Sequence, residues 1–237
     1  MVYITLIIQE TTFYCSSERH GTRNHCQEWY GIIQMKIEAT NNQLTTTLND
    51  WNVADEFKNM TLEEIQAIQR RESLPFAVGA LNLTGGLNLG SIIRSAVIFG
   101  AEKFYIIGKR RYDRRSTVGA QNYINIEYIE EDVVDIEGQK RILDKIGDDY
   151  NPIFIEQGGT DITSQEFQHW DRCCFIFGEE GTGIPTSMID LARQNKTDRI
   201  LTIDQIGVLR SLNVSAAAAI VMHKVAMDLR TPRGYKD

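Results

Sequence analysis

Short apolar runs alternate with helix-like segments from Pro75 to Leu229, and this alternation limits the possible folds more than any other feature of the chain. Apolar runs of about four to eight residues are typical of strands buried on both faces. Strands are predicted at Phe76–Leu83, Lys103–Ile107, Ile124–Ile129, Pro152–Ile155, Cys173–Phe177 and Ile200–Ile203. Helices are predicted at Gly90–Phe99, Gly138–Asp148, Thr186–Arg193 and Ser211–Leu229. The pattern indicates an α/β fold with a mostly parallel sheet flanked by helices.

The segment before this pattern has a different character. Thr61 and Glu64 have the spacing of a capping box, so residues 61–72 are predicted to form an amphipathic helix. Residues 1–50 show no sustained periodicity, and Met35 offers a second start, so residues 1–34 are interpreted as an appendage to the core. We therefore expect an N-terminal extension over 1–50, a helical extension over 51–74 and the main domain over 75–237.

The composition is that of an ordinary soluble protein, with 42% hydrophobic and 24% charged residues. No apolar run approaches the ~20 residues that a membrane span needs. Cys173 and Cys174 are adjacent in a predicted strand, so their side chains should point to opposite faces. Cys15 and Cys26 lie beside two histidines, but no Cys-x-x-Cys pair accompanies them, so neither a metal site nor a disulfide is expected. Reduced thiols favour a cytoplasmic protein.

The net charge of −7 argues against a general nucleic-acid binder, which is usually basic. A local basic cluster is nevertheless present, formed by Arg110, Arg111, Arg114 and Arg115. Such clusters are more often a solvated face than a binding site, so the cluster alone predicts little.

Three polar, glycine-containing turns follow predicted strands. The first is Asn88-Leu89-Gly90, which opens a helix and places Arg94 one turn further on. A helix N-terminus offers free N–H groups to an anion, and an arginine can grip a phosphate with two hydrogen bonds. The alternative interpretation is an ordinary turn that contains a glycine for conformational reasons, followed by a surface arginine.

The second turn runs from Gly178 to Gly183 and contains Glu179 and Glu180, with Pro185 placed to start the next helix. Two carboxylates are poor phosphate ligands but suit hydroxyl or amine groups, such as those of a ribose or an amino-acid moiety. A solvated turn is the alternative interpretation.

The third turn follows Ile203 and contains Arg210-Ser211-Leu212-Asn213-Val214, ahead of the four alanines 216–219. A helix of small residues can pack closely, so such a turn can be held rigidly in a crowded site. This turn is the most specific of the three, because strand, glycine, Ser-Leu-Asn and alanine helix must coincide.

In this order the three turns resemble the motifs of the SpoU (TrmH-like) branch of the SPOUT RNA methyltransferases. The matching residues are Asn88, Gly90 and Arg94, then Gly178, Glu180 and Gly183, then Ser211 to Val214. The resemblance covers about Phe76 to Leu229, and the third motif is closest to the tRNA guanosine ribose methyltransferases. Asp204 stands where the family usually has proline.

The resemblance implies an α/β fold with a C-terminal trefoil knot and a homodimer whose site is completed across the interface. It implies S-adenosylmethionine bound by Gly178, Ile203 and Leu212, and methyl transfer to a ribose 2′-OH of structured RNA, with tRNA favoured over ribosomal RNA. A non-catalytic RNA-binding protein that retains the fold is a further alternative. A dehydrogenase is not expected, because no Gly-x-Gly-x-x-Gly follows the first strand.

The resemblance also maps catalytic roles onto Asn88, Arg94, Glu180, Ser211 and Asn213. An arginine is effectively always protonated, so we expect Arg94 to clamp a phosphate and stabilise the developing alkoxide rather than act as a base. Asn213 and Ser211 would orient Arg94 and the ribose, and Glu180 would shape its loop. The cluster Arg110, Arg111, Arg114 and Arg115 would lie on the RNA-facing side.

Overall fold

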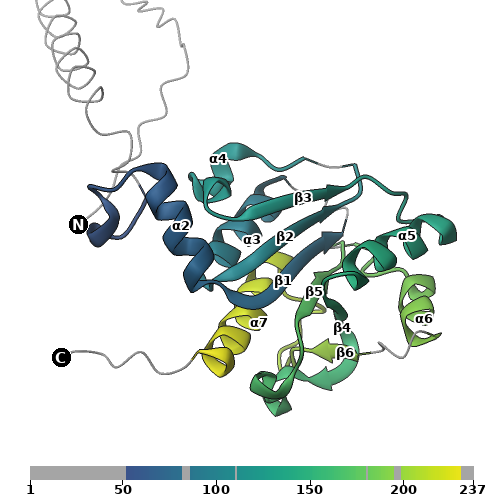
Figure 1. The fold of residues 1–237 in the computed structure, drawn as a ribbon. Helices are drawn as coiled ribbons and strands as arrows, with labels where there is room; N and C mark the ends of the chain where they lie inside the picture. The colour runs from purple at the N-terminus through teal and green to yellow at the C-terminus, as the bar shows by residue number, and fades with distance from the viewer. Residues whose placement is uncertain (1–51, 82–85, 110, 180, 195–198, 231–237) are drawn as a thin grey trace, which may run out of the picture. The chain divides into compact units, whose positions relative to one another are not determined.

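The apolar runs form one parallel sheet in the computed structural model, which describes residues 52–81, 86–109, 111–179, 181–194 and 199–230. The six strands follow the order β3-β2-β1-β5-β4-β6 (Figure 1). Their bounds are β1 Leu74–Leu81, β2 Ala101–Ile107, β3 Asn125–Ile129, β4 Asn151–Asp161, β5 Cys173–Phe177 and β6 Arg199–Thr202. Every pairing between neighbouring strands is parallel, which confirms the predicted α/β sheet.

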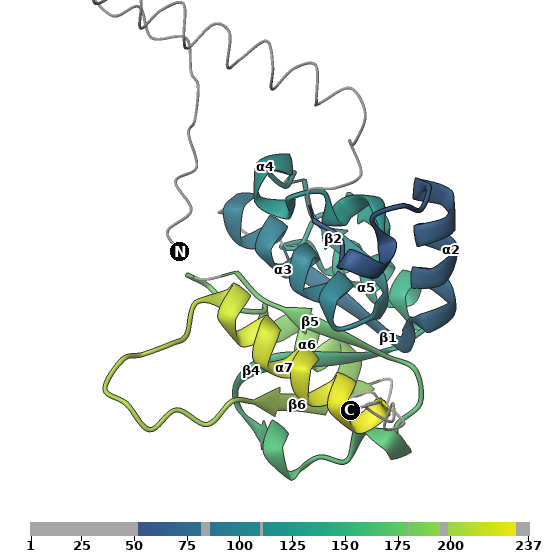
Figure 2. The same cartoon turned by 90° about the vertical axis from the view of Figure 1, so that its left-hand side faces the viewer.

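Helices cover both faces of the sheet (Figures 1 and 2). The helices α3 (Gly86–Ile98) and α7 (Val214–Leu229) share one buried cluster, whereas α5 (Ile136–Gly147) and α6 (Thr186–Gln194) belong to the other. The remaining elements are η1 Asp55–Phe57, α2 Leu62–Glu72, α4 Arg114–Thr117, η2 Ala120–Asn122, η3 Ile162–Ser164 and η4 Phe167–His169. The fold is therefore three layers deep, with the sheet in the middle.

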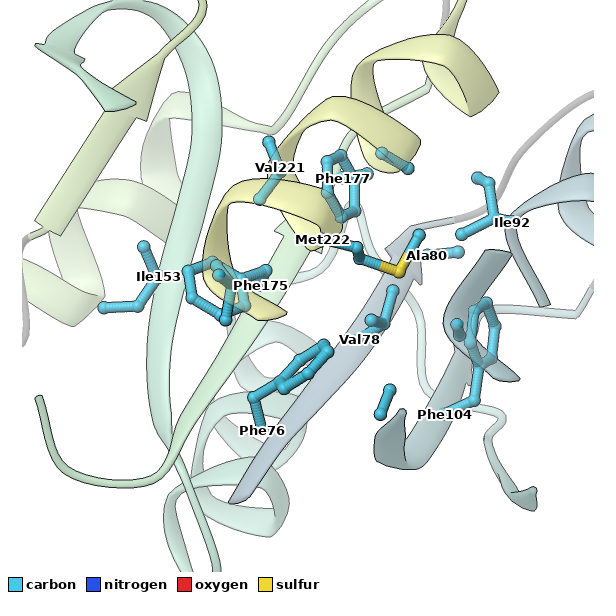
Figure 3. Packing of buried hydrophobic residues seen from close by; sticks show 14 of the residues in the cluster. Phe76, Val78, Ala80, Ile92, Phe104, Ile153, Phe175, Phe177, Val221 and Met222 are labelled. Carbon is cyan, nitrogen blue, oxygen red and sulfur yellow. The ribbon is translucent and has the colours of Figure 1, made fainter. Parts of the chain in front are cut away.

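The central strands divide their side chains between two apolar layers. On β1, Phe76, Val78 and Ala80 face α7, while Ala77 and Leu81 join the cluster on the opposite face, as the two-residue period of a strand requires. Figure 3 shows Met222 of α7 reaching toward Val78 and Ala80, with Phe175 beside Phe76. The rings of Phe76 and Phe175 meet edge to face, with centroids 6.2 Å apart.

Two predictions about single residues are confirmed. Thr61 and Glu64 form the capping box at the start of α2, where each side chain accepts a hydrogen bond from the other residue's backbone N–H. Cys173 and Cys174 are buried free thiols in opposite layers, and burial raises the pKa of the Cys174 thiol. Reactive cysteines need the opposite pKa shift, so Cys174 is a packing residue.

Three predicted element bounds are wrong, each because of a contact distant in sequence or a cap. Helix α3 begins at Gly86 rather than Gly90, so Asn88 lies inside its first turn. Helix α7 begins at Val214, because the Asn213 side chain accepts the N–H groups of Ser215 and Ala216 as an N-cap. Strand β4 continues to Asp161, six residues past the predicted end, after an interruption in its pairing with β6.

Some predictions are not tested by these elements. The extension over 1–50, the appendage 1–34 and the thiols Cys15 and Cys26 lie outside the described residues, and the trefoil knot stays a prediction. In the described part of the chain, no helix is long and apolar enough to cross a bilayer. The same residues contain no group of His, Cys, Asp and Glu side chains that could hold a metal ion.

Candidate functional site

The second and third motifs meet at the carboxyl ends of β4, β5 and β6. They line a cavity of about 470 Å³, to which Gly178, Ile203, Ser211 and Leu212 contribute. A volume of this size is within the range of small-ligand pockets. The carboxyl edge of a parallel sheet is also where open α/β folds place their ligands. The structure thus brings together the three residues predicted to bind the cofactor.

The loop after β5 is shaped by glycines that leave no room for side chains. A Cβ atom on Gly178 would lie 2.5 Å from the carbonyl carbon of Gly183 and 2.6 Å from the nitrogen of Ile184. Gly183 has φ +70°, which favours glycine. Glu179 and Gly183 exchange backbone hydrogen bonds of 3.3 and 2.8 Å. The loop therefore folds back on itself and presents backbone groups at the cavity, while Glu180 lies outside the described residues.

Asn213 joins the third motif to the first. Its Oδ1 accepts hydrogen bonds from the Ser215 and Ala216 N–H groups at 2.9 and 3.3 Å, and from the Ser215 hydroxyl at 2.6 Å. Its Nδ2 donates to Oδ1 of Asn88 on α3, 3.1 Å away. One amide side chain therefore caps α7 and holds two motifs together across 125 residues of sequence. Ser211 lies just before this cap, at the cavity.

Arg94 does not line this cavity. It lies six residues after Asn88 on α3, and at about 100° per residue the two side chains leave the helix in directions about 120° apart. Arg94 is exposed and lines a second cavity of about 480 Å³, together with Asn52, Asp55, Lys58 and Tyr123. Within a single chain, Ser211 therefore lines one cavity and Arg94 lines another.

The described arginines of the basic cluster differ in their partners. Arg115 forms a two-pronged ion pair with Asp113, which lowers the pKa of that carboxyl. Arg111 pairs with Glu130 and stacks on the ring of Tyr128, 4.2 Å from its centroid. Arg114 is exposed and has no ion pair within the part of the chain that the structure describes. Nearby acids thus balance part of this charge, and Arg110 lies outside the described residues.

Two residues at the cavity, Glu156 and Gln157, were not identified from the sequence. Both lie where β4 leaves its pairing with β6, after Ile155 and before Thr160. Glu156 accepts the N–H of Ile184 at 3.0 Å, and Gln157 donates to the carbonyl of Arg210 at 2.8 Å. The only sequence signal was the pair Gly158-Gly159, which indicates a break in a strand.

This geometry defines an α/β protein with a ligand cavity at the carboxyl edge of its parallel sheet, walled by a glycine loop and a Ser-Leu-Asn turn. The chain belongs to the SpoU rRNA Methylase family, whose model matches residues 75–223. The predicted family is therefore confirmed.

Known proteins show the same relationship. A Bacillus subtilis (strain 168) protein, named as a TrmH family tRNA/rRNA methyltransferase, is 27% identical over 164 residues, or 68% of this chain. The match spans 61% of that relative's length. The A. aeolicus TrmH/SpoU tRNA modifying enzyme shares the fold with a TM-score of 0.57 and 18% identity, over 70% of this chain and 81% of its own. The AdoMet-bound rRNA methyltransferase of Sinorhizobium meliloti has a TM-score of 0.54 and 21% identity, over 69% and 61%.

Proposed function

We propose that the chain is an RNA 2′-O-ribose methyltransferase that uses S-adenosylmethionine and acts on structured RNA, with tRNA as the favoured substrate. The observation that carries the proposal is the Asn213–Asn88 hydrogen bond, which unites the first and third family motifs beside the cavity of the second. Ribosomal RNA is the alternative substrate. The tRNA preference rests on the residues of the Ser211–Val214 motif and on the tRNA modifying enzyme that shares the fold.

The cavity residues fit the proposed cofactor. A Cβ on Gly178 would overlap the backbone of Gly183 and Ile184, so this glycine lets the loop fold tightly on itself beside the cavity. Glu179 lines the cavity and forms no ion pair with any described residue, so its carboxylate can face a cationic or hydroxyl-bearing ligand. When bound, S-adenosylmethionine supplies a methyl group that its sulfonium has already activated. Gly178, Ile203 and Leu212 would hold it, as the resemblance implies.

The chain then has to place a ribose hydroxyl and stabilise the charge that develops on its oxygen. Arg94 would grip the phosphate next to the target ribose and stabilise the forming alkoxide, because a guanidinium keeps its proton at neutral pH. Ser211 and Asn213 would orient the ribose and the arginine, with Asn88 fixing Asn213 and Glu180 shaping the glycine loop. Alignment of this kind supplies much of the acceleration in a reaction with an activated donor.

A homodimer would reunite Arg94 with the cavity. In one chain Arg94 lines a different cavity, so a second copy has to supply the arginine if all motif residues act together. The loop between β6 and α7 supports this arrangement, since Figure 2 shows it extended and its Ile206, Val208 and Leu209 side chains are at least 80% exposed. Exposed apolar side chains of this kind are typical of an interface.

The experiment that tests the function is incubation with radiolabelled S-adenosylmethionine and total RNA, followed by mass spectrometry of the nucleosides. We expect label in a 2′-O-methylated nucleoside from tRNA. A base-methylated product would overturn the ribose assignment, and bound cofactor without transfer would support the non-catalytic alternative.

Substitution of Arg94 tests the proposed clamp. Arg94→Lys keeps the charge but loses the two-pronged grip, so we expect at least about a tenfold loss of methyl transfer. Arg193→Lys is the matched control, because Arg193 is exposed on α6 and pairs only with Asp190 among the described residues. Near-normal transfer by Arg94→Lys would exclude the clamp.

The basic cluster gives a separate test of RNA binding. Arg114→Gln is expected to weaken RNA affinity more than Arg115→Gln, because Arg115 is already paired with Asp113. Filter binding at low salt measures both variants, and equal affinities would remove Arg114 from the RNA-facing surface.

A further inference from the structure

The interruption in β4 places two side chains between the loops that wall the cavity. Ile155 pairs with Leu201 of β6, and the pairing resumes when Thr160 lies opposite the same Leu201. Residues 156–159 therefore form a bulge that leaves the plane of the strand. The bulge directs Glu156 and Gln157 toward the cavity, which both residues line.

Glycines make this bulge possible. Gly158 has φ +79°, a conformation that other residues adopt only with strain. Gly159 lies so close to Ile200 of β6 that an added Cβ would overlap the Ile200 carbonyl. The sequence Glu-Gln-Gly-Gly thus has a structural reason at each glycine, and the two polar residues before them face the cavity.

Glu156 acts on the glycine loop. Its Oε2 accepts the N–H of Ile184 at 3.0 Å, and its Oε1 accepts the N–H of Gln157 at 3.0 Å. The same Oε2 lies 2.5 Å from the position that a Cβ on Gly183 would take, so the carboxylate also fills the space beside that glycine. Ile184 is buried and follows directly on the loop, so the bond anchors the loop to the sheet.

Gln157 acts on the other wall of the cavity. Its Nε2 donates to the carbonyl of Arg210 at 2.8 Å, next to Ser211. The segment from Asp204 to Asn213 is exposed and contains no regular helix or strand, and this hydrogen bond ties it to β4. Adjacent residues of one bulge therefore contact both walls of the cavity.

We propose that Glu156 is a positioning residue that holds the Gly178–Gly183 loop in its ligand-binding form, and that the β4 bulge couples this loop to the Arg210–Asn213 turn. The inference rests on the proposed function, since the ligand in question is S-adenosylmethionine. Glu156 acts through an accepted hydrogen bond, so an amide oxygen at this position replaces much of its effect. Loss of the acceptor would leave the Ile184 N–H unpaired in a partly buried place.

Binding of S-adenosylmethionine is measured by titration calorimetry for the parent, Glu156→Ala, Glu156→Gln and Glu166→Ala. We expect about a tenfold weaker affinity for Glu156→Ala, and a loss of no more than about threefold for Glu156→Gln. Glu166→Ala is the matched control, because Glu166 is exposed and contacts only His169 among the described residues. Equal loss in the two Glu156 variants, or none in Glu156→Ala, would overturn the proposal.

Hydrogen exchange without ligand separates this inference from the proposed function. We expect faster exchange over residues 178–184 in Glu156→Ala and over 208–212 in Gln157→Ala. Gly159→Ala should accelerate both segments, because it displaces the bulge without altering either polar side chain. Unchanged exchange in Glu156→Ala overturns the positioning role. If the variants exchange as expected but the parent does not bind S-adenosylmethionine, the proposed function is overturned. Glu156 then remains the anchor of the loop.

Discussion

The amino-terminal edge of the sheet and the cavity at its carboxyl edge are held by different interactions. Near the amino-terminal ends of the strands, charged side chains pair with one another: Lys103 with Glu127 at 2.8 Å, Lys145 with Glu127 at 2.7 Å, and Arg172 with Glu102 at 2.7 Å. The guanidinium of Arg172 also donates to the hydroxyl of Tyr150, which lies just before β4. The charges of these side chains are therefore balanced within the edge itself.

At the carboxyl ends of β4, β5 and β6, the loops around the cavity are held instead by hydrogen bonds from side chains, most of them to backbone groups. Glu156 accepts the Ile184 N–H, Gln157 donates to the Arg210 carbonyl, and Asn213 caps α7 while holding Asn88. No described residue forms an ion pair with Glu156. Bonds of this type fix the shape of the cavity walls. We therefore expect ligand binding at this edge and pH-dependent stability at the other.

The largest expected effect comes from adding a side chain at Gly178. Gly178→Ala puts a Cβ within 2.6 Å of the Gly183 and Ile184 backbone, so the loop has to move. We expect a destabilisation of about 1–3 kcal/mol and at least about tenfold weaker binding of S-adenosylmethionine. Gly147→Ala is the control, because nothing beyond its chain neighbours lies within 4 Å of its Cβ position and it does not line the cavity. Calorimetric titration and urea unfolding measure both variants, and similar behaviour of the two would contradict a close-fitting loop.

Substitutions at Asn213 test whether the stability of the fold and methyl transfer depend on different bonds of this side chain. Asn213→Ala loses the cap and the bond to Asn88, so we expect about 1 kcal/mol less stability and a loss of methyl transfer. Asn213→Ser keeps a capping oxygen but is too short to reach Asn88, so stability should return while transfer stays low. Urea unfolding and the radiolabel assay compare the variants. Restored transfer in Asn213→Ser would show that the link to Asn88 is dispensable.

The carboxyl edge also shows what the sequence could and could not predict. Each strand except β4 was found within a few residues, because an apolar run such as Cys173–Phe177 has to be buried wherever the chain places it. The start of α3 was missed because Gly90 suggested a turn. Gly90 is needed there because Ser116 of α4 packs against it. Ser116 lies 26 residues further along the chain, so no local pattern reveals the contact.

The contacts of Glu156 were missed for a related reason. A Glu-Gln-Gly-Gly segment after a strand indicates a loop, and only the return of β4 to Leu201 of β6 shows that it is a bulge. The angle between the Asn88 and Arg94 side chains follows from helix geometry. It can be worked out only when α3 is known to begin at Gly86, which places both residues in one helix. The motifs thus predicted the family, whereas the connections around the cavity depended on pairing between distant segments.

The smallest effect is expected at the amino-terminal edge, from Glu127→Gln. Hydrogen bonds from Lys103 and Lys145 hold the pKa of the Glu127 carboxyl below its ordinary value of 4.5, although partial burial opposes them. A carboxyl with a lowered pKa in the folded state stabilises the fold above its unfolded pKa, and this contribution disappears as the pH falls through the folded pKa. Glu127→Gln should therefore cost up to about 1 kcal/mol at neutral pH, and the difference from the parent should vanish in acid.

Urea unfolding between neutral and acid pH measures this difference, with Glu137→Gln as a control for an exposed pair with Lys140. Affinity for S-adenosylmethionine at neutral pH should stay at the parent value, because Glu127 does not line the cavity. A variant that lost cofactor affinity along with its acid-dependent stability would show that the two edges are energetically coupled through the strands. The assignment of the two edges to separate tasks would then fail.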